Sequence, residues 1–523
     1  MKGLPAETDF IVIGAGVAGL RAAIELAAAG RVLVLAKKEV MHSGTAPTPG
    51  AATSALSDEE ELILHLQDTL IAGDGLCRPE GVKILVEEGV ERIEELIAWG
   101  KQLDRNGTKL TFESEASYSH SHVLRAPGES VANEVLRTLH AKARACKHIS
   151  MLEFEFITDL LTEDQRVTGV SLISEKGMPE EIACSAVMLA TGGLGQLYRN
   201  TTNPETFTAD GMAMAFRAGG EVSDLEFIQF YPTVLYMKKA PPILLPEGLR
   251  AEGGYLRSIE MDRFMGKYHP LAEMAPADVV ARAIMHEMEV SRARDPFVYL
   301  DLTHLNAARV QKRLPRIYAT CMKHNIDITE DVIPIRPAAH YSIGGVRANL
   351  DGKTSLAGLY AAGETAATGV HGANRFTSNS LLEGLVYGAR AGKAMREELK
   401  HARKPAKAPK KAASQNGPVD AGIEELIGQI QDTMWKGAGV VRTRAGMQEA
   451  IRVLEAMSPR LAHPRTRRSH EAANLHLAGL LVARSALARE ESRGAHYRTD
   501  CPGHDDKKFL KHSVVKGESL RFL

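Results

Sequence analysis

The sequence has few cysteines, and they are dispersed. Its five cysteines, among 523 residues, stand at positions 77, 146, 184, 321 and 501 without a CxxC pair or the spacing of a zinc finger. An odd and scattered set argues against a disulfide framework and against a cysteine metal site, and it fits a reducing compartment. We therefore expect no bound metal.

Long apolar runs and an excess of one charge are also missing. No apolar run approaches the length of about 18 residues that a transmembrane helix needs, and the N-terminus lacks the charged and apolar regions of a signal peptide. Lys and Arg total 64 against 65 Asp and Glu, a net charge of −1, so no basic surface points to nucleic acid. We expect a cytoplasmic protein with no membrane span and a small-molecule partner.

The composition itself is that of a large globular enzyme. Hydrophobic residues make up 44% of the chain and charged residues 25%, which is ordinary for a soluble domain. At roughly 150 residues per domain, the length suggests three or four domains. A chain of this size buries a large hydrophobic core and does not need disulfide bonds to stabilise its fold.

The N-terminus carries a complete strand–helix–strand unit. An apolar run at 9–13 leads into Gly-Ala-Gly-Val-Ala-Gly at 14–19, then a helix-forming stretch at 20–29 and a second apolar run at 31–35. In this context the GxGxxG pattern predicts a dinucleotide site: the glycines allow a tight turn, close approach to a pyrophosphate and close helix–strand packing. The acid that usually binds the ribose is replaced by Ala-Lys-Lys at 36–38, so the pattern does not choose between NAD and FAD.

Two further glycine turns follow strand-like segments far along the chain. One ends a predicted strand at 182–190 and the other lies at 358–364, before a predicted helix at 380–399. Three such turns, interrupted by an insertion, indicate one nucleotide-binding domain split by another. We predict a discontinuous FAD-binding domain at 1–232 and 340–399, a capping domain at 233–339, a Lys- and Pro-rich linker at 400–417 and a C-terminal helical domain at 418–523.

Several motifs together resemble the L-aspartate oxidase family, within the succinate dehydrogenase/fumarate reductase flavoprotein superfamily. They are GAGVAGL at 14–20, ATGG at 190–193, LEFIQF at 225–230, PAAHY at 337–341, HGANR at 371–375 and ESRGAHY at 491–497. The resemblance covers nearly the whole chain. It implies an α/β fold with a Rossmann-like FAD-binding domain, interrupted by an α+β capping domain and followed by a C-terminal helical bundle.

The resemblance also implies a cofactor and a reaction. The family oxidises L-aspartate to iminoaspartate by hydride transfer to N5 of FAD, which oxygen or fumarate reoxidises. Iminoaspartate feeds quinolinate and NAD biosynthesis, so quinolinate synthase is the expected downstream enzyme. The histidine that carries covalent flavin in succinate dehydrogenase-like relatives aligns with Ser43, which predicts non-covalent FAD, although His42 lies one residue earlier.

The resemblance assigns individual residues to the site. Arg375 and His340 match the pair that binds the substrate carboxylate, and Glu115 matches an acid near the substrate ammonium; these three are the expected catalytic residues. Gln229 and Tyr231 join Arg375 and His340 as expected substrate contacts. The expected FAD contacts are Gly14, Ala15, Gly16, Val17, Ala18, Gly19, Lys37, Ser43, Gly50, Asp210, Glu364, Ser380 and Leu381.

Four positions depart from the family pattern. The second substrate histidine is Tyr231, the threonine before Glu247 is Pro246, and the proton-transferring arginine is Ala277. The flavin-side Ala-Gln-Gly-Gly has become Pro-Thr-Pro-Gly at 47–50. Loss of an arginine removes a charge-assisted contact worth about 1.5–3 kcal/mol, and Arg250 or Arg282 lie close enough in sequence to replace it.

Three hypotheses follow from these matches and departures. The first is an active L-aspartate oxidase with a rearranged site. The second is an FAD oxidoreductase of the same family that acts on a different amino or carboxylic acid, because the pole opposite Arg375 is less polar. The third is a catalytically silent FAD-binding paralogue, suggested by Ala277 and the changed run at 47–50.

Overall fold

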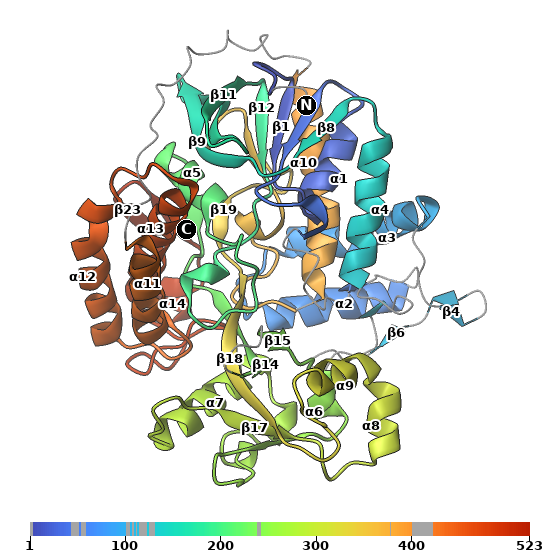
Figure 1. The fold of residues 1–523 in the computed structure, drawn as a ribbon, viewed down its shortest axis with the longest axis vertical. Helices are drawn as coiled ribbons and strands as arrows, with labels where there is room; N and C mark the ends of the chain where they lie inside the picture. Colours follow the sequence, from blue (N-terminus) through green and yellow to red (C-terminus); the bar gives the residue numbers. More distant parts are fainter. Residues whose placement is uncertain are drawn as a thin grey trace.

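The computed structural model describes most of the chain. The described residues are 4–42, 52–53, 59–100, 105–106, 109–110, 112–113, 123–124, 131–237, 242–376, 378–399 and 422–523. Figure 1 shows three regions: a sheet covered by helices, a smaller region below it, and a group of C-terminal helices at one side.

A five-stranded parallel sheet forms the centre of the first region. Its spatial order is β20 (Leu359–Ala361), β12 (Ala186–Leu189), β1 (Phe10–Ile13), β2 (Val32–Leu35) and β8 (Ile149–Leu152). β1 and β2 are four-residue apolar runs that are buried throughout, as expected for strands covered on both faces. The N-terminal unit predicted from the sequence is therefore confirmed.

The two faces of this sheet belong to two different cores. Phe10 and Val12 of β1 pack with the helices on one face, whereas Ile11 and Ile13 join the core of the other face, as strand alternation requires. The helices are α1 (Val17–Leu26), α3 (Pro79–Ala98), α4 (Val131–Ala145) and α10 (Asn379–Leu399). The opposite face carries an antiparallel sheet of β9 (Phe156–Glu163), β10 (Arg166–Ile173) and β11 (Pro179–Ala183) (Figure 1).

A row of glycines lets α10 lie directly against α1. Gly384, Gly388 and Gly392 recur every four residues, so they share one face of α10. A Cβ at Gly388 would lie 2.6 Å from the carbonyl oxygen of Ala18, and a Cβ at Gly392 would lie 2.9 Å from that of Ala22. The close approach packs the middle of α10 directly against α1.

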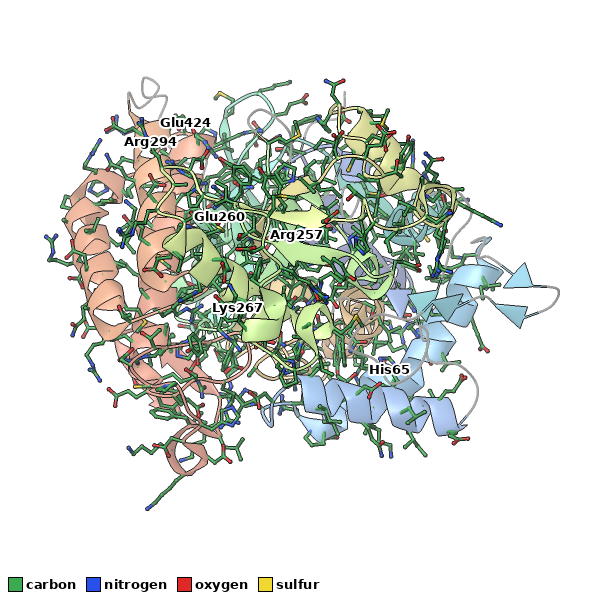
Figure 2. All side chains as sticks on the ribbon, turned by 90° about the horizontal axis from the view of Figure 1, so that it is seen from below. His65, Arg257, Glu260, Lys267, Arg294 and Glu424 are labelled. Atoms are coloured by element: carbon green, nitrogen blue, oxygen red, sulfur yellow. The ribbon has the colours of Figure 1, made fainter. Side chains whose placement is uncertain are left out.

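The inserted region is built on a second, antiparallel sheet. Its order is β15 (Ile243–Leu244), β14 (Ile228–Leu235), β18 (Ile333–Ser342), β17 (Val298–Asp301) and β16 (Tyr255–Arg257). Helices α6 (Gly248–Ala251), α7 (Ala277–Val290), α8 (Ala307–Arg313) and α9 (Pro315–Met322) accompany it. In Figure 2 this region, marked by Arg257, Glu260 and Lys267, lies toward the viewer, with Glu424 of α11 (Ile423–Ala438) and His65 of α2 (Glu59–Ala72) on opposite sides.

The predicted boundaries of the inserted region fall inside two strands. Positions 232–233 lie within β14 and positions 339–340 lie within β18. Both strands pair along their length, so they run continuously from the FAD-binding region into the capping region. The domain boundaries themselves stay a prediction.

The C-terminal region combines three long helices and the short helix α14 (Asp506–Phe509) with a β-hairpin. The long helices are α11 (Ile423–Ala438), α12 (Arg444–Leu461) and α13 (Arg467–Ala488). The hairpin, β22 (Ser513–Lys516) and β23 (Ser519–Phe522), extends a sheet that also contains β13 (Val222–Ser223), β19 (Gly345–Arg347) and β21 (Ala366–Ala367). The region is therefore not purely helical, because its last residues complete a sheet of the FAD-binding region.

The predicted fold class is confirmed, and one predicted strand is corrected. The segment 182–190 is not a single strand: it divides into β11 and β12 at Cys184–Ser185, where the chain passes from the antiparallel sheet to the parallel one. An apolar run cannot reveal such a passage, because the residues on both sides of it, 182–183 and 186–189, are buried. No helix within the described ranges is long and apolar enough to cross a lipid bilayer.

Candidate active site

A large cleft opens where the parallel strands end. The residues that follow β1, β12 and β20 line it, namely Gly14–Ala18, Ala190–Gly192 and Ala362–Glu364. It encloses about 1410 Å³, including its open mouth. In α/β sheets, ligands bind outside the carboxyl ends of the strands, and this volume admits a molecule as large as a dinucleotide.

The glycine turn after β1 fits a bound pyrophosphate. Gly14 has φ +105°, and a Cβ there would lie 2.1 Å from the carbonyl oxygen of Ala190, so only glycine is accommodated. A Cβ at Gly19 would lie 2.0 Å from the carbonyl oxygen of Gly14, which makes Gly19 a packing residue. Gly16 is the N-cap of α1 and, as a glycine, offers no side chain to bond the N–H groups of this helix end. Its N–H groups therefore face the cleft as an anion site.

Lys37 and Asp210 form one charged corner of the cleft. The ammonium of Lys37 donates to Asp210 Oδ2 at 2.9 Å, Thr208 Oγ1 at 2.7 Å and Thr206 O at 3.3 Å, and it lies 2.6 Å from Glu471 Oε1. Burial lowers the pKa of Lys37, but the two carboxylates outweigh burial and the pKa is raised overall. Lys37 thus lines the cleft as a cation already paired with protein groups.

Glu364 and the start of α10 form another part of the wall. Glu364 Oε1 accepts a hydrogen bond from the Ser342 backbone N–H at 3.0 Å. Burial raises the pKa of Glu364 to about 7, against the opposing effects of that bond and of Arg375. Ser380 and Leu381, in the first turn of α10, line the same cleft.

Arg375 and His340 meet at the end of the cleft nearest the capping region. Arg375 comes from the loop before α10 and His340 from β18, and both line the cleft while being only 4% exposed. The guanidinium of Arg375 donates from Nη2 to Gln229 Oε1 at 2.8 Å and lies 3.8 Å from the ring centroid of Tyr341. A buried guanidinium of this kind suits a carboxylate ligand.

His340 is held as a neutral imidazole. Its Nδ1 lies 2.8 Å from Thr202 Oγ1, and Tyr231 packs edge-on against the ring with centroids 5.4 Å apart. Burial lowers the pKa of His340 to about 3, and the positive charge of Arg375 adds to the effect. The imidazole is therefore uncharged throughout the physiological pH range.

Not every expected residue lies on the large cleft. Gly19 and Tyr231 are buried behind its wall, and Gln229 lines a smaller cleft together with Ala277, Asp278, Arg282, Asn374 and Tyr497. Ser43, Gly50 and Glu115 lie outside the described residues, as does the changed run at 47–50. Their expected roles stay predictions.

Comparisons with known proteins agree with this geometry. A family model for an FAD binding domain matches residues 9–381, and one for the C-terminal part of fumarate reductase flavoproteins matches residues 428–521. An L-aspartate oxidase of Streptomyces coelicolor is 39% identical, with 97% of this chain and 91% of the relative covered. L-aspartate oxidase 1 of Ralstonia nicotianae is also 39% identical, covering 94% of this chain and 95% of the relative.

The chain belongs to the L-aspartate oxidase family. Solved structures place this family member in the wider superfamily: a quinol-fumarate reductase with menaquinol has a TM-score of 0.87 at 29% identity, covering 99% of this chain and 97% of that one. A Mycobacterium smegmatis Sdh1 in complex with UQ1 has a TM-score of 0.87 at 30% identity, covering 99% and 93%. The predictions of an FAD-dependent oxidoreductase and of FAD as cofactor are confirmed.

The departures of this L-aspartate oxidase family member can now be located. Ala277 begins α7 and lines the smaller cleft with Arg282, which pairs with Asp278 at 2.7 Å. Arg250 is 2% exposed, donates to the carbonyl oxygen of Glu273 at 2.5 Å and lies 3.6 Å from Glu247 Oε1. Of the two arginines that the sequence offered as replacements, Arg282 therefore shares a cleft with Ala277.

Sequence reasoning missed the side chains that hold the site residues in place. Thr202 bonds His340 from 138 positions away, and Tyr341 lies under Arg375. Glu383 accepts a hydrogen bond from Tyr341. Tyr341 could have been found as the neighbour of His340 in the PAAHY motif, whereas nothing in the sequence links Thr202 to His340.

Proposed function

We propose that this protein oxidises L-aspartate to iminoaspartate, with O2 or fumarate as electron acceptor, and so supplies quinolinate and NAD biosynthesis. The observation that carries the proposal is the buried Arg375–His340 pair on the FAD cleft, in a chain whose relatives over nearly its whole length are named L-aspartate oxidase. A changed substrate and a silent paralogue are not favoured, because the chain retains both the FAD cleft and the buried Arg375–His340 pair on it.

Arg375 would bind one carboxylate of the substrate. Its guanidinium is desolvated and fixed on one side by Gln229, so little side-chain entropy is lost when a carboxylate arrives. A bound carboxylate would receive two parallel N–H donors from such a group. The substrate is thereby oriented with its Cα toward the cleft.

His340 would contribute as a neutral group rather than as a cation. Thr202 holds Nδ1, which leaves Nε2 for the cleft that His340 lines. With its pKa lowered to about 3 by burial and by Arg375, the imidazole accepts or donates a hydrogen bond without adding positive charge. FAD, when bound, supplies the hydride acceptor at N5.

The residues of the family pattern that would hold FAD fit the cleft. Gly14–Ala18 bring the open N-terminus of α1 to the pyrophosphate, and Lys37, Asp210, Glu364, Ser380 and Leu381 line the same space. We propose non-covalent binding because position 43 is serine, whose hydroxyl cannot form a histidyl link. The same proposal includes quinolinate synthase as downstream enzyme and a cytoplasmic location. It also includes the division of the chain into a discontinuous FAD-binding domain, a capping domain, a linker and a C-terminal helical domain.

Anaerobic reduction of the flavin tests the function directly. Purified, FAD-loaded protein is mixed with L-aspartate without oxygen, and the visible absorption of the flavin is followed. We expect bleaching. Persistence of the oxidised spectrum, with FAD bound, would refute aspartate oxidation, and other amino and hydroxy acids would then be tried.

One pair of variants tests the assignment of Arg375. Arg375→Ala should raise KM for L-aspartate at least roughly tenfold, because a charge-assisted contact of about 1.5–3 kcal/mol is lost. Arg347→Ala serves as the control: Arg347 is a partly exposed arginine paired with Glu221, and its loss should leave KM unchanged. Equal kinetics for Arg375→Ala and wild type would refute the assignment.

A further inference from the structure

Behind Arg375 lies a buried hydrogen-bonded group that no step of the reaction uses. Its centre is Glu383, on α10, which is 1% exposed. Glu383 Oε2 accepts hydrogen bonds from the Tyr341 hydroxyl at 2.8 Å and from His371 Nε2 at 2.9 Å, and Oε1 accepts one from Thr368 Oγ1 at 3.0 Å. A buried carboxylate is retained only where such donors compensate for its desolvation.

This group reaches the site through one side chain. Tyr341 is 6% exposed and follows His340 on β18, and its ring lies under the guanidinium of Arg375 at 3.8 Å. Its hydroxyl points the other way, to Glu383. One aromatic ring therefore joins the anchored carboxylate on α10 to the cation on the cleft.

The hydroxyl bond constrains the ring in two ways. It fixes the rotation of Tyr341 about its side-chain bonds, because the hydroxyl has a single charged acceptor in a buried setting. It also places a negative charge at the far end of the ring, which makes the ring face more attractive to a cation. Burial, followed by the charge of Glu383, raises the pKa of Tyr341 well above its usual value, so the hydroxyl remains a donor.

We propose that Tyr341 and Glu383 are positioning residues that hold the Arg375 guanidinium in the orientation needed to bind a substrate carboxylate. Gln229 constrains the same guanidinium from β14, so the ring and the amide together fix how the guanidinium is oriented at the cleft that Arg375 lines. The inference rests on the proposed function, in that Arg375 is taken as the carboxylate ligand. Tyr341 and Glu383 do not themselves touch the substrate; they act through Arg375.

The test measures ligand affinity apart from turnover. Fumarate does not reduce oxidised flavin, so its Kd is obtained from the change that it causes in the flavin absorption of the FAD-loaded protein. Tyr341→Phe keeps the ring and removes the hydroxyl. We expect Kd for fumarate and KM for L-aspartate to rise together, roughly tenfold, while kcat changes by less than about threefold.

The matched control is another buried tyrosine hydroxyl on the same helix as Glu383. Tyr387 donates to the carbonyl oxygen of Gly81 at 2.8 Å. Tyr387→Phe should lower thermal stability about as much as Tyr341→Phe but leave Kd for fumarate unchanged. In an Arg375→Gln background, Tyr341→Phe should have no further effect on Kd, because coupled residues are not additive.

Three results would overturn the proposal: an unchanged Kd in Tyr341→Phe, an equal rise in Tyr387→Phe, or a full effect of Tyr341→Phe in the Arg375→Gln background. If Tyr341→Phe yields no flavin-loaded protein, Glu383→Gln replaces it. That variant keeps a neutral, weaker acceptor for Tyr341, and a rise in Kd of roughly two- to fivefold is expected. If wild-type flavin is not reduced by L-aspartate, the proposed function fails, while the fumarate measurement still decides the role of Tyr341.

Discussion

Ala277 shows how a single residue alters what this site is expected to do. It begins α7 and lines the smaller cleft with Gln229 and Arg282, at the position where the family resemblance expects a proton-transferring arginine. Fumarate reduction requires a proton delivered to carbon, whereas a neutral amine can lose a hydride without that arginine. The two directions of the reaction should therefore respond differently to residue 277.

Replacing Ala277 by arginine should accelerate fumarate reduction. We expect Ala277→Arg to increase fumarate reduction by about 10² or more and to leave aspartate oxidation unchanged or faster, both measured by steady-state kinetics. Ala277→Met adds similar bulk without charge and should give no increase. Equal rates in the two variants would mean that the smaller cleft responds to volume and not to a guanidinium.

Glu364 gives the cofactor-free protein a defined pH dependence. Burial raises its pKa from 4.5 to about 7 in the folded state. Because the folded state keeps this proton while the unfolded state loses it, the contribution of Glu364 to stability is present below about pH 4.5 and is lost as the pH rises to about 7. Thermal unfolding of the FAD-free protein should show a smaller fall in Tm between pH 5 and 7.5 in Glu364→Gln than in wild type. Identical dependence of Tm on pH in Glu364→Gln and wild type would contradict the raised pKa of Glu364.

At the scale of elements, the sequence predicts what is local. The apolar runs of β1 and β2 and the glycine turn between β1 and α1 follow from neighbouring residues, and the motifs around His340 and Arg375 mark the site. Other features depend on segments far apart in the chain: β12 is divided from β11 by its pairing with β1 and β20, and Tyr341 contacts Glu383. Such contacts are decided by packing, which a single sequence does not display.

The glycine row of α10 is an element-scale feature that also supports the site. A Cβ at Gly388 would lie 2.6 Å from the carbonyl oxygen and 3.1 Å from the Cα of Ala18, which lines the FAD cleft. Since these are backbone atoms, α10 or α1 has to move. Gly388→Ala should therefore lower the free energy of unfolding by about 1–3 kcal/mol and weaken FAD binding, measured by urea unfolding and by flavin retention.

Gly428→Ala is the corresponding control in an open position. Gly428 lies within α11, and the nearest atom to an added Cβ is an Arg199 nitrogen at 3.9 Å. Alanine is the better helix former by about 1 kcal/mol, so this variant should be slightly more stable than wild type. A stabilising Gly388→Ala would show that the two helices are not in close contact.

At the scale of the whole molecule, the C-terminal region is tied to the FAD-binding region by buried charge. Glu226, between β13 and β14, accepts hydrogen bonds from Arg489 Nε and Ser513 Oγ, both at 2.7 Å, and the Glu226 and Arg489 side chains are fully buried. Arg489 also donates to the carbonyl oxygens of Phe509 and Lys511. Glu226 thus links the segment between β13 and β14 to the end of α13 and to the terminal hairpin.

Breaking the Glu226–Arg489 pair should therefore affect the whole protein. Among the described residues, Glu226→Gln leaves Arg489 with Glu491 as its one buried carboxylate partner, and we expect the free energy of unfolding to fall by about 3 kcal/mol. The control is Glu424→Gln at the residue of α11 that Figure 2 labels. It breaks the exposed pair of Glu424 with Arg468 and should cost less than about 1 kcal/mol. Both values come from urea unfolding followed by circular dichroism.

Because the buried pair joins the regions, Glu226→Gln should also separate the unfolding of the C-terminal helices from loss of FAD. A single unchanged transition would refute the linking role.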